Sequence, residues 1–95
     1  MSTNLSAAIT ITSSDGLDPE LSALITMKAV AFESSVRLTH GDQQANAKSL
    51  IEVMSLSLVC GDALNIHTAG DDAQLALNAL INLIQHYRVN RIRNN

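Results

Sequence analysis

Aromatic residues and cysteine are scarce in this chain. Aromatic side chains account for 2% of the 95 residues, so a hydrophobic core has to be packed from Leu, Ile, Val, Met and Ala. The single cysteine, Cys60, excludes an intrachain disulfide. A structural metal site needs ligands close together, and the three histidines, His40, His67 and His86, are scattered along the chain. We therefore expect neither a bound metal nor a cofactor.

Long apolar runs are also absent. No stretch approaches the roughly 20 apolar residues that are needed to cross a bilayer. Residues 1–4 lack the basic residues and the apolar stretch of a signal peptide. The sequence therefore predicts a cytoplasmic protein without a membrane partner.

Basic residues are few and unevenly placed. Of the six Lys and Arg residues, Arg88, Arg91 and Arg93 lie in the last eight positions, after all nine acidic residues. A protein that binds nucleic acid needs a basic face, and the body of this chain is acidic. We therefore expect no nucleic-acid partner.

Hydrophobic periodicity divides the chain into seven elements. Ile9 and Ile11 alternate with threonines, as in a half-buried strand, and Asp18-Pro19-Glu20 is a typical helix start. The apolar stripe from Ala73 to Tyr87 has helical spacing. The patterns predict strands over 5–12, 35–39, 43–47 and 63–68, and helices over 19–31 and 50–58 and from Gly70-Asp71-Asp72 to Tyr87.

This order of elements, β-α-β-β-α-β-α, indicates an α+β fold. It suits a four-stranded antiparallel sheet with three helices on one face, an open-faced β-sandwich. The length and the 46% hydrophobic content are typical of one globular domain. We expect a single domain over 1–95, with its core at about 5–88 and a basic tail at 89–95.

Several short motifs share their order and spacing with a known family. The stretches are Ile9-Thr10-Ile11-Thr12 with Gly16-Leu17, Asn46-Ala47-Lys48-Ser49-Leu50 with Met54-Ser55-Leu56, and Gly61 with Gly70-Asp71-Asp72. From about Ile9 to Tyr87 the chain resembles the histidine-containing phosphocarrier (HPr) family of the bacterial sugar phosphotransferase system. The resemblance implies the HPr-like fold and a protein that is not an enzyme.

The active-site motif of that family, Gly-Leu-His-x-Arg-Pro-Ala, is altered here. The stretch reads Gly16-Leu17-Asp18-Pro19-Glu20-Leu21-Ser22, which puts Asp18 at the phosphoacceptor histidine and Glu20 at the arginine. Glu20 would repel a phosphate that the arginine would attract. The resemblance therefore implies a degenerate member without a catalytic residue.

Asp18 has three possible roles. It is the expected N-cap of the helix that starts at Pro19. It could also accept a phosphoryl group as an aspartyl phosphate, although no cation is at hand to support that chemistry. As a third possibility, its permanent charge could imitate a phosphorylated histidine.

Ser49 and the segment after it form the second candidate region. Lys48-Ser49-Leu50 matches a position that a dedicated kinase phosphorylates in some family members, so Ser49 is a candidate for regulatory phosphorylation. An ordinary N-cap serine explains it equally well. The family docks partners through this apolar segment and the active-site loop. The resemblance thus implies that Asp18, Glu20, Lys48, Ser49, Leu50, Ile51 and Met54 bind a partner.

These observations favour a regulatory or adaptor protein that binds a protein partner without phosphotransfer. The partners would be components of the phosphotransferase system or a serine kinase. One alternative is a phosphocarrier of the same system with another acceptor, Asp18. Another is an interaction protein unrelated to sugar transport that keeps only the scaffold.

Overall fold

The computed structural model describes residues 3–87 and confirms the open-faced α+β sandwich. Its elements in chain order are β1 (Thr3–Thr10), α1 (Pro19–Ala29), β2 (Ser35–His40), β3 (Gln43–Asn46), α2 (Leu50–Met54), β4 (Ala63–Gly70) and α3 (Ala73–His86). The predicted basic tail, 89–95, lies outside the described residues. Within the described part, no helix is long and apolar enough to cross a membrane.

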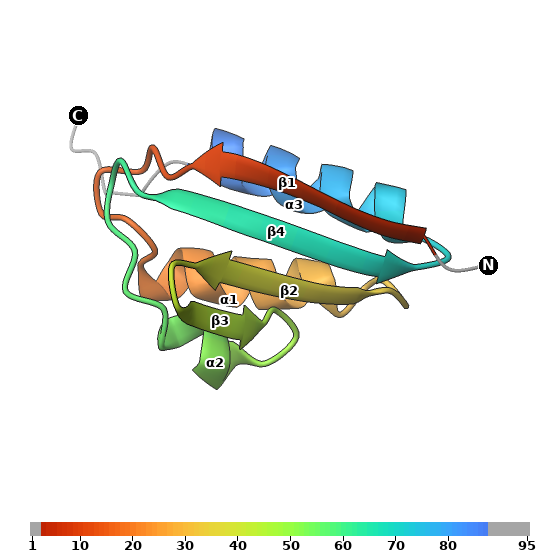
Figure 1. Ribbon diagram of the computed structural model, residues 1–95. Helices are drawn as coiled ribbons and strands as arrows, with labels where there is room; N and C mark the ends of the chain where they lie inside the picture. Colours follow the sequence, from red (N-terminus) through yellow and green to blue (C-terminus); the bar gives the residue numbers. More distant parts are fainter. Residues whose placement is uncertain (1–2, 88–95) are drawn as a thin grey trace, which may run out of the picture.

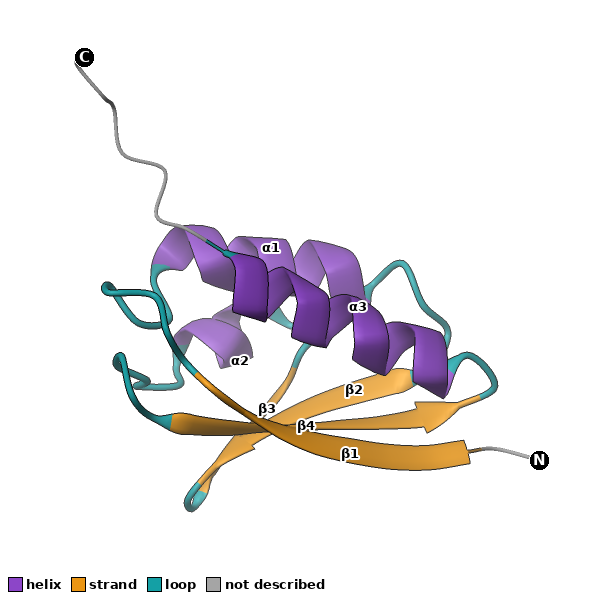
Figure 2. Ribbon diagram, turned by 90° about the horizontal axis from the view of Figure 1, so that it is seen from above, coloured by secondary structure: helices purple, strands orange, loops and turns teal. Residues whose placement is uncertain are grey.

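The four strands form one antiparallel sheet in the order β1-β4-β2-β3. The two long connections cross over, so β4, the last strand in the sequence, lies between β1 and β2 (Figure 1). All three helices cover the same face of the sheet and leave the other face open (Figure 2). Because side chains alternate along a strand, each strand divides its residues between the core and solvent.

The core lies between the sheet and the helices. In β4, Leu64 and Ile66 are buried, and they pair with Ile9 of β1 and Leu38 of β2, which are also buried. From α3, the buried side chains that complete this core are Ala73, Ala76, Leu77, Leu80 and Ile84. The predicted stripe of α3 is thus the face that packs on the sheet.

The first helix begins where the sequence predicts, at Pro19, with Asp18 as N-cap. It ends two residues earlier than predicted, at Ala29, where Val30 forms the C-cap. The predicted strand over 5–12 lies at 3–10 instead, and β4 runs on to Gly70. These shifts are small, and they arise because the ends of helices and strands depend on local hydrogen bonds that periodicity does not record.

The second helix is the main correction to the predicted elements. The prediction of a helix over 50–58 is wrong in its second half, because α2 ends at Met54. The Ser55 hydroxyl donates to the carbonyl oxygen of Glu52 over 2.6 Å and closes the last turn. Beyond it the chain is irregular, and Leu56 and Leu58 are buried while Ser57 is exposed. The apolar run 50–58 therefore combines a very short helix with an extended segment in which buried and exposed residues alternate.

The loop before α1 is tied to the segment after α2. The N–H of Leu17 donates to the carbonyl of Leu58 over 3.1 Å, and Ile11 exchanges backbone hydrogen bonds with Gly61 and Asp62. Gly16 has a φ of +66°, and a Cβ at this position would collide with the Leu58 carbonyl oxygen. The two candidate regions of the sequence thus meet at one end of the molecule.

Candidate functional site

Asp18 is committed to contacts within the protein. Its Oδ1 accepts the N–H of Leu21 over 2.7 Å, which satisfies one of the free donors in the first turn of α1. The residue is half-buried. The predicted N-cap role of Asp18 is therefore present in the structure.

Tyr87 closes the same site from the far end of the chain. Its hydroxyl lies 3.2 and 3.1 Å from the two carboxylate oxygens of Asp18 and 3.1 Å from Oε1 of Glu20. A phenol has one hydrogen to donate, so the two acidic residues share it. The last residue of the α3 stripe thus tethers both acidic residues at the start of α1.

The environment of Tyr87 favours its neutral form. Only 6% of the residue is exposed. Burial, followed by the hydrogen bonds to Asp18 and Glu20 and by their negative charges, raises the pKa of the Tyr87 hydroxyl far above its ordinary value. The hydroxyl therefore stays a hydrogen-bond donor throughout the physiological pH range.

At α2, Ser49 has the predicted N-cap geometry. Its hydroxyl accepts the N–H of Glu52 over 3.4 Å, a long bond. The Glu52 carboxylate in turn accepts the N–H of Asn46 over 2.8 Å. Ser49 therefore caps the first turn of α2, while the Glu52 side chain ties that turn back to the end of β3 at Asn46.

The apolar residues of α2 and the segment after it divide into two groups. Val53, Leu56 and Leu58 are buried in the core. Leu50, Ile51 and Met54 are exposed by 41%, 80% and 52%. Helical geometry thus leaves three predicted partner-binding residues on the surface of a helix with only five residues.

Lys48 has a structural contact that the sequence does not reveal. Its Nζ donates to the carbonyl oxygen of Phe32 over 2.7 Å. This bond anchors the chain beyond α1 to the start of α2. The ammonium group predicted to meet a partner is therefore engaged within the protein.

The histidines occupy separate places. His40, the last residue of β2, lies 2.7 Å from the Ala63 carbonyl and 3.7 Å from Asp62. His67 of β4 contacts Thr39, and His86 contacts the Asn82 carbonyl of its own helix. In residues 3–87, no three His, Cys, Asp or Glu side chains group together as metal ligands.

Asp72, at the N-cap position of α3, binds a neighbouring loop instead of its own helix. Its carboxylate accepts the N–H groups of Ser34 and Glu33 over 2.9 and 3.0 Å. Hydrogen bonding by Ser34 and Glu33 to the carboxylate lowers the pKa of Asp72. The acidic start predicted for α3 therefore also fixes the turn between α1 and β2.

Sequence reasoning assigned Tyr87 to the apolar stripe and missed its contact with Asp18 and Glu20. The only signal was chemical: tyrosine is the one residue of that stripe with a hydroxyl, and a buried hydroxyl needs a partner. Nothing in the sequence says which partner, because Tyr87 lies 69 positions from Asp18.

Comparison with known proteins identifies the family. The model described as "PTS HPr component phosphorylation site" matches residues 5–86. The phosphocarrier protein HPr of Haemophilus influenzae is 37% identical over 76 residues, which are 80% of this chain and 89% of that protein. The HPr-like protein Crh of Halalkalibacterium halodurans is 34% identical over 70 residues, 74% of this chain and 83% of that protein.

The same family is found among solved structures. A crystal structure of a phosphocarrier protein HPr from Bacillus anthracis has a TM-score of 0.82 and 29% identity, and the match covers 86% of this chain and 98% of that chain. The four-stranded sheet and the three helices are thus shared along nearly the whole described chain. Sequence and structure agree that this protein belongs to the HPr family of the bacterial phosphotransferase system.

Proposed function

We propose that this HPr-family protein is a cytoplasmic regulatory or adaptor protein, which binds a protein partner and transfers no phosphoryl group. The observation that carries the proposal is the double engagement of the Asp18 carboxylate by Leu21 and Tyr87. In this interpretation Asp18 stands where the family has its phosphoacceptor. The first histidine of the sequence is His40, which lies at the end of β2 and beyond the end of α1.

Electrostatics at the start of α1 supports the proposal. A phosphate there would meet Asp18 and Glu20, two carboxylates that already share one phenol hydrogen. Two unit charges about 4 Å apart interact by about 4 kcal/mol at a surface-like dielectric. Repulsion on that scale is large against the about 1.4 kcal/mol of a tenfold change in equilibrium. This argument also disfavours an aspartyl phosphate on Asp18, the alternative acceptor.

The partner would contact the exposed side of this end of the molecule. Leu50, Ile51 and Met54 offer apolar side chains of the kind that anchor protein interfaces. Glu20, exposed in the first turn of α1, adds a negative charge that favours a partner with basic residues around an apolar centre. Components of the phosphotransferase system are the partners that the family suggests.

Ser49 is the proposed point of regulation. The residue is only half-buried, and its hydroxyl accepts one long hydrogen bond. A phosphate added there would lie at the beginning of α2 and close to the exposed apolar residues. It would alter partner contacts directly, so a serine kinase would be the second partner.

The decisive test is intact-protein mass spectrometry after incubation with enzyme I and phosphoenolpyruvate from a bacterium with this system. We expect no added phosphate on the protein, and one added phosphate on an HPr control in the same reaction. A gain of one phosphate would contradict the proposal. Stability of the product in hydroxylamine and in acid would then tell a phosphohistidine from an acyl phosphate on Asp18.

A restoring variant sharpens this test. The double change Asp18→His and Glu20→Arg restores the histidine and the arginine of the family motif at the start of α1, and Tyr87→Phe can be added to free the site. We expect enzyme I to phosphorylate the restored variant, which would also show that the docking surface still works. Glu33→Arg makes the same charge change as Glu20→Arg in a distant exposed loop. It is the control for added positive charge and should stay unlabelled.

Partner binding is tested separately. Immobilised protein should retain enzyme I or a sugar-specific transporter domain, and Ile51→Asp should weaken that binding at least tenfold. Leu75→Asp alters another exposed apolar residue, 65% exposed and on α3, and should leave binding unchanged. Equal loss in both variants, or no binding to any component, would favour the scaffold-only alternative.

A further inference from the structure

The open face of the sheet has an unusual charge pattern for this protein. On the three adjacent strands β1, β4 and β2, the outward positions pair Ser6 with His67 and His67 with Arg37. No acidic residue lies within these strands, although the chain has nine. Arg37 is one of only three Lys and Arg residues in the described part. These three strands therefore combine the positive charge of Arg37 with an absence of acidic residues of their own.

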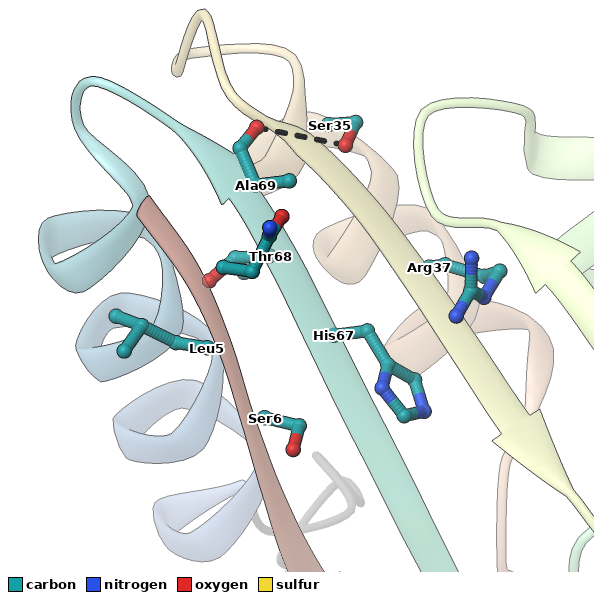
Figure 3. A pocket seen from close by; sticks show the side chains of 8 residues that line it. Leu5, Ser6, Ser35, Arg37, His67, Thr68 and Ala69 are labelled. Atoms are coloured by element: carbon teal, nitrogen blue, oxygen red, sulfur yellow. Dashed lines mark hydrogen bonds between the residues drawn. The ribbon is translucent and has the colours of Figure 1, made fainter. Parts of the chain in front are cut away.

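Small residues turn this part of the face into a hollow. Ser6, Ser35 and Ala69 surround the longer side chains of Arg37 and His67, and the hollow measures about 280 Å³ (Figure 3). The volume lies just below the about 300–1,000 Å³ of pockets for drug-sized ligands. It exceeds what a single small ion fills, so it suits a small molecule.

The two titratable side chains of the hollow are available for a ligand. Arg37 has no ion pair among residues 3–87. The ion pair that is present there joins His40 and Asp62. His67 is oriented by a 3.0 Å hydrogen bond between its Nε2 and the Thr39 hydroxyl. Its Nδ1 has no hydrogen-bond partner within the described chain, so an N–H at that atom can donate to a ligand.

We propose that this hollow binds the phosphate group of a small phosphorylated molecule, with the Arg37 guanidinium as the charged contact and the His67 imidazole as a hydrogen-bond donor. A guanidinium presents two parallel N–H groups that match two phosphate oxygens. The imidazole N–H supplies a third donor, and the hydroxyls of Ser6 and Ser35 line the rest of the hollow. The site lies on the face opposite the helices, so it is separate from the proposed partner surface at Asp18 and α2 (Figure 2).

Glu52 is the acidic residue that could compete with the ligand. It lines a neighbouring hollow on the β3 side of Arg37. Its carboxylate oxygen, however, accepts the N–H of Asn46 over 2.8 Å, and no ion pair with Arg37 is present among the described residues. The negative charge of Glu52 thus lowers the affinity of the hollow for an anion, but it leaves Arg37 available.

The test is a titration of the full chain with glycerol 3-phosphate and with inorganic phosphate, followed by amide NMR at constant ionic strength. We expect saturable shifts at Ser6, Arg37 and His67 with either probe. Tighter binding of glycerol 3-phosphate would identify a phosphorylated small molecule as the source of the phosphate. Tighter binding of inorganic phosphate would identify free phosphate instead and overturn the small-molecule part of the proposal.

Variants make the result specific. Arg37→Gln should weaken phosphate binding at least tenfold, while Lys28→Gln, which removes an exposed cation on α1, should leave it unchanged. Glu52→Gln should leave the affinity equal or raise it. Shifts that do not saturate, that acetate reproduces at equal concentration, or that persist in Arg37→Gln would overturn the proposal. The adaptor function would stand in either case, because its test uses other residues.

Discussion

At the start of α1, Asp18 and Glu20 share the hydroxyl of the buried Tyr87, whereas on α2 Ile51 and Met54 stay exposed to solvent. Both regions lie at one end of the molecule, and the Leu17–Leu58 backbone bond connects them. The first region satisfies its own polar groups, and the second leaves apolar surface uncovered. The comparison teaches that, at one end of this domain, the start of α1 engages its acidic side chains within the protein while α2 leaves apolar side chains uncovered.

The largest effect is expected where the two regions join. Gly16→Ala should lower the free energy of unfolding by about 2–4 kcal/mol, because alanine is strained at this positive φ and its Cβ would collide with the Leu58 carbonyl. Urea unfolding measures the loss. Gly41→Ala is the matched control, since Gly41 also has a positive φ but faces open space. Equal losses in the two variants would show that the Gly16 contact has no importance of its own.

The second largest loss of stability is expected when the contact between Tyr87 and the start of α1 is removed. Tyr87→Phe removes the hydroxyl shared by the two acidic residues and should cost about 1–2 kcal/mol of stability. Urea unfolding gives the size, and faster hydrogen exchange at the Leu21 amide would place the change at the start of α1. Glu20→Gln keeps an acceptor for Tyr87 and should cost less. A larger loss in Glu20→Gln than in Tyr87→Phe would contradict the shared hydrogen bond.

The same region predicts a dependence on alkaline pH. Because the folded protein raises the pKa of Tyr87 above its ordinary value of 10.0, the unfolded chain releases that proton first. The stabilisation is complete below about pH 10 and is lost as the pH rises further. The stability difference between the wild type and Tyr87→Phe should stay constant up to about pH 10 and shrink as the pH is raised from about 10 to 11. A constant difference would show that the tyrosine is not the titrating group.

A smaller loss of stability is expected at Ser49, the N-cap of α2. Ser49→Ala removes the acceptor for the Glu52 N–H and should cost about 0.5–1 kcal/mol, at the low end for a cap because the bond is long. Ser49→Asp restores an acceptor and should recover most of the stability. Thermal unfolding of the three proteins side by side provides the measurement. Failure of Ser49→Asp to recover would weaken the N-cap assignment.

The smallest effect should come from the exposed side chains of α2. Ile51→Ser should change the stability by no more than about 0.5 kcal/mol, because the side chain is 80% exposed. Val53→Ser, two residues along the same helix, removes apolar volume from a fully buried position and should lower the stability several times as much. Similar losses in both would mean that Ile51 is covered in solution. The contrast between the start of α1, which satisfies its own polar groups, and the uncovered side of α2 would then be wrong.

Much of the fold could be predicted because its elements follow strong local signals. Asp18-Pro19 marks the start of α1, and the apolar stripe of α3 coincides with the residues that pack on the sheet. The end of α2 could not be predicted from its apolar run, because a helix and an alternating extended segment bury similar residues over so short a length. The Ser55 hydrogen bond that ends the helix is visible only in the structure.

The candidate site divides in the same way. Asp18, Ser49 and the exposed residues of α2 were identified from their sequence pattern and their resemblance to the family. The Tyr87 contact and the Lys48 bond to Phe32 were missed, because both join segments that are distant along the chain. The hollow around Arg37 and His67 was missed for the same reason, since it depends on three strands that pair out of sequence order.

By itself, the sequence determined the order of the elements, the capping of α1 and α2, and the acidic pair at the start of α1, because each depends on residues within one or two helical turns. Only the tertiary structure decided which partner the Tyr87 hydroxyl has and which apolar residues of α2 remain exposed. It also decided that Arg37 lies beside His67 on the open face of the sheet. Those outcomes depend on strand register and helix packing, which bring together residues that no local pattern connects.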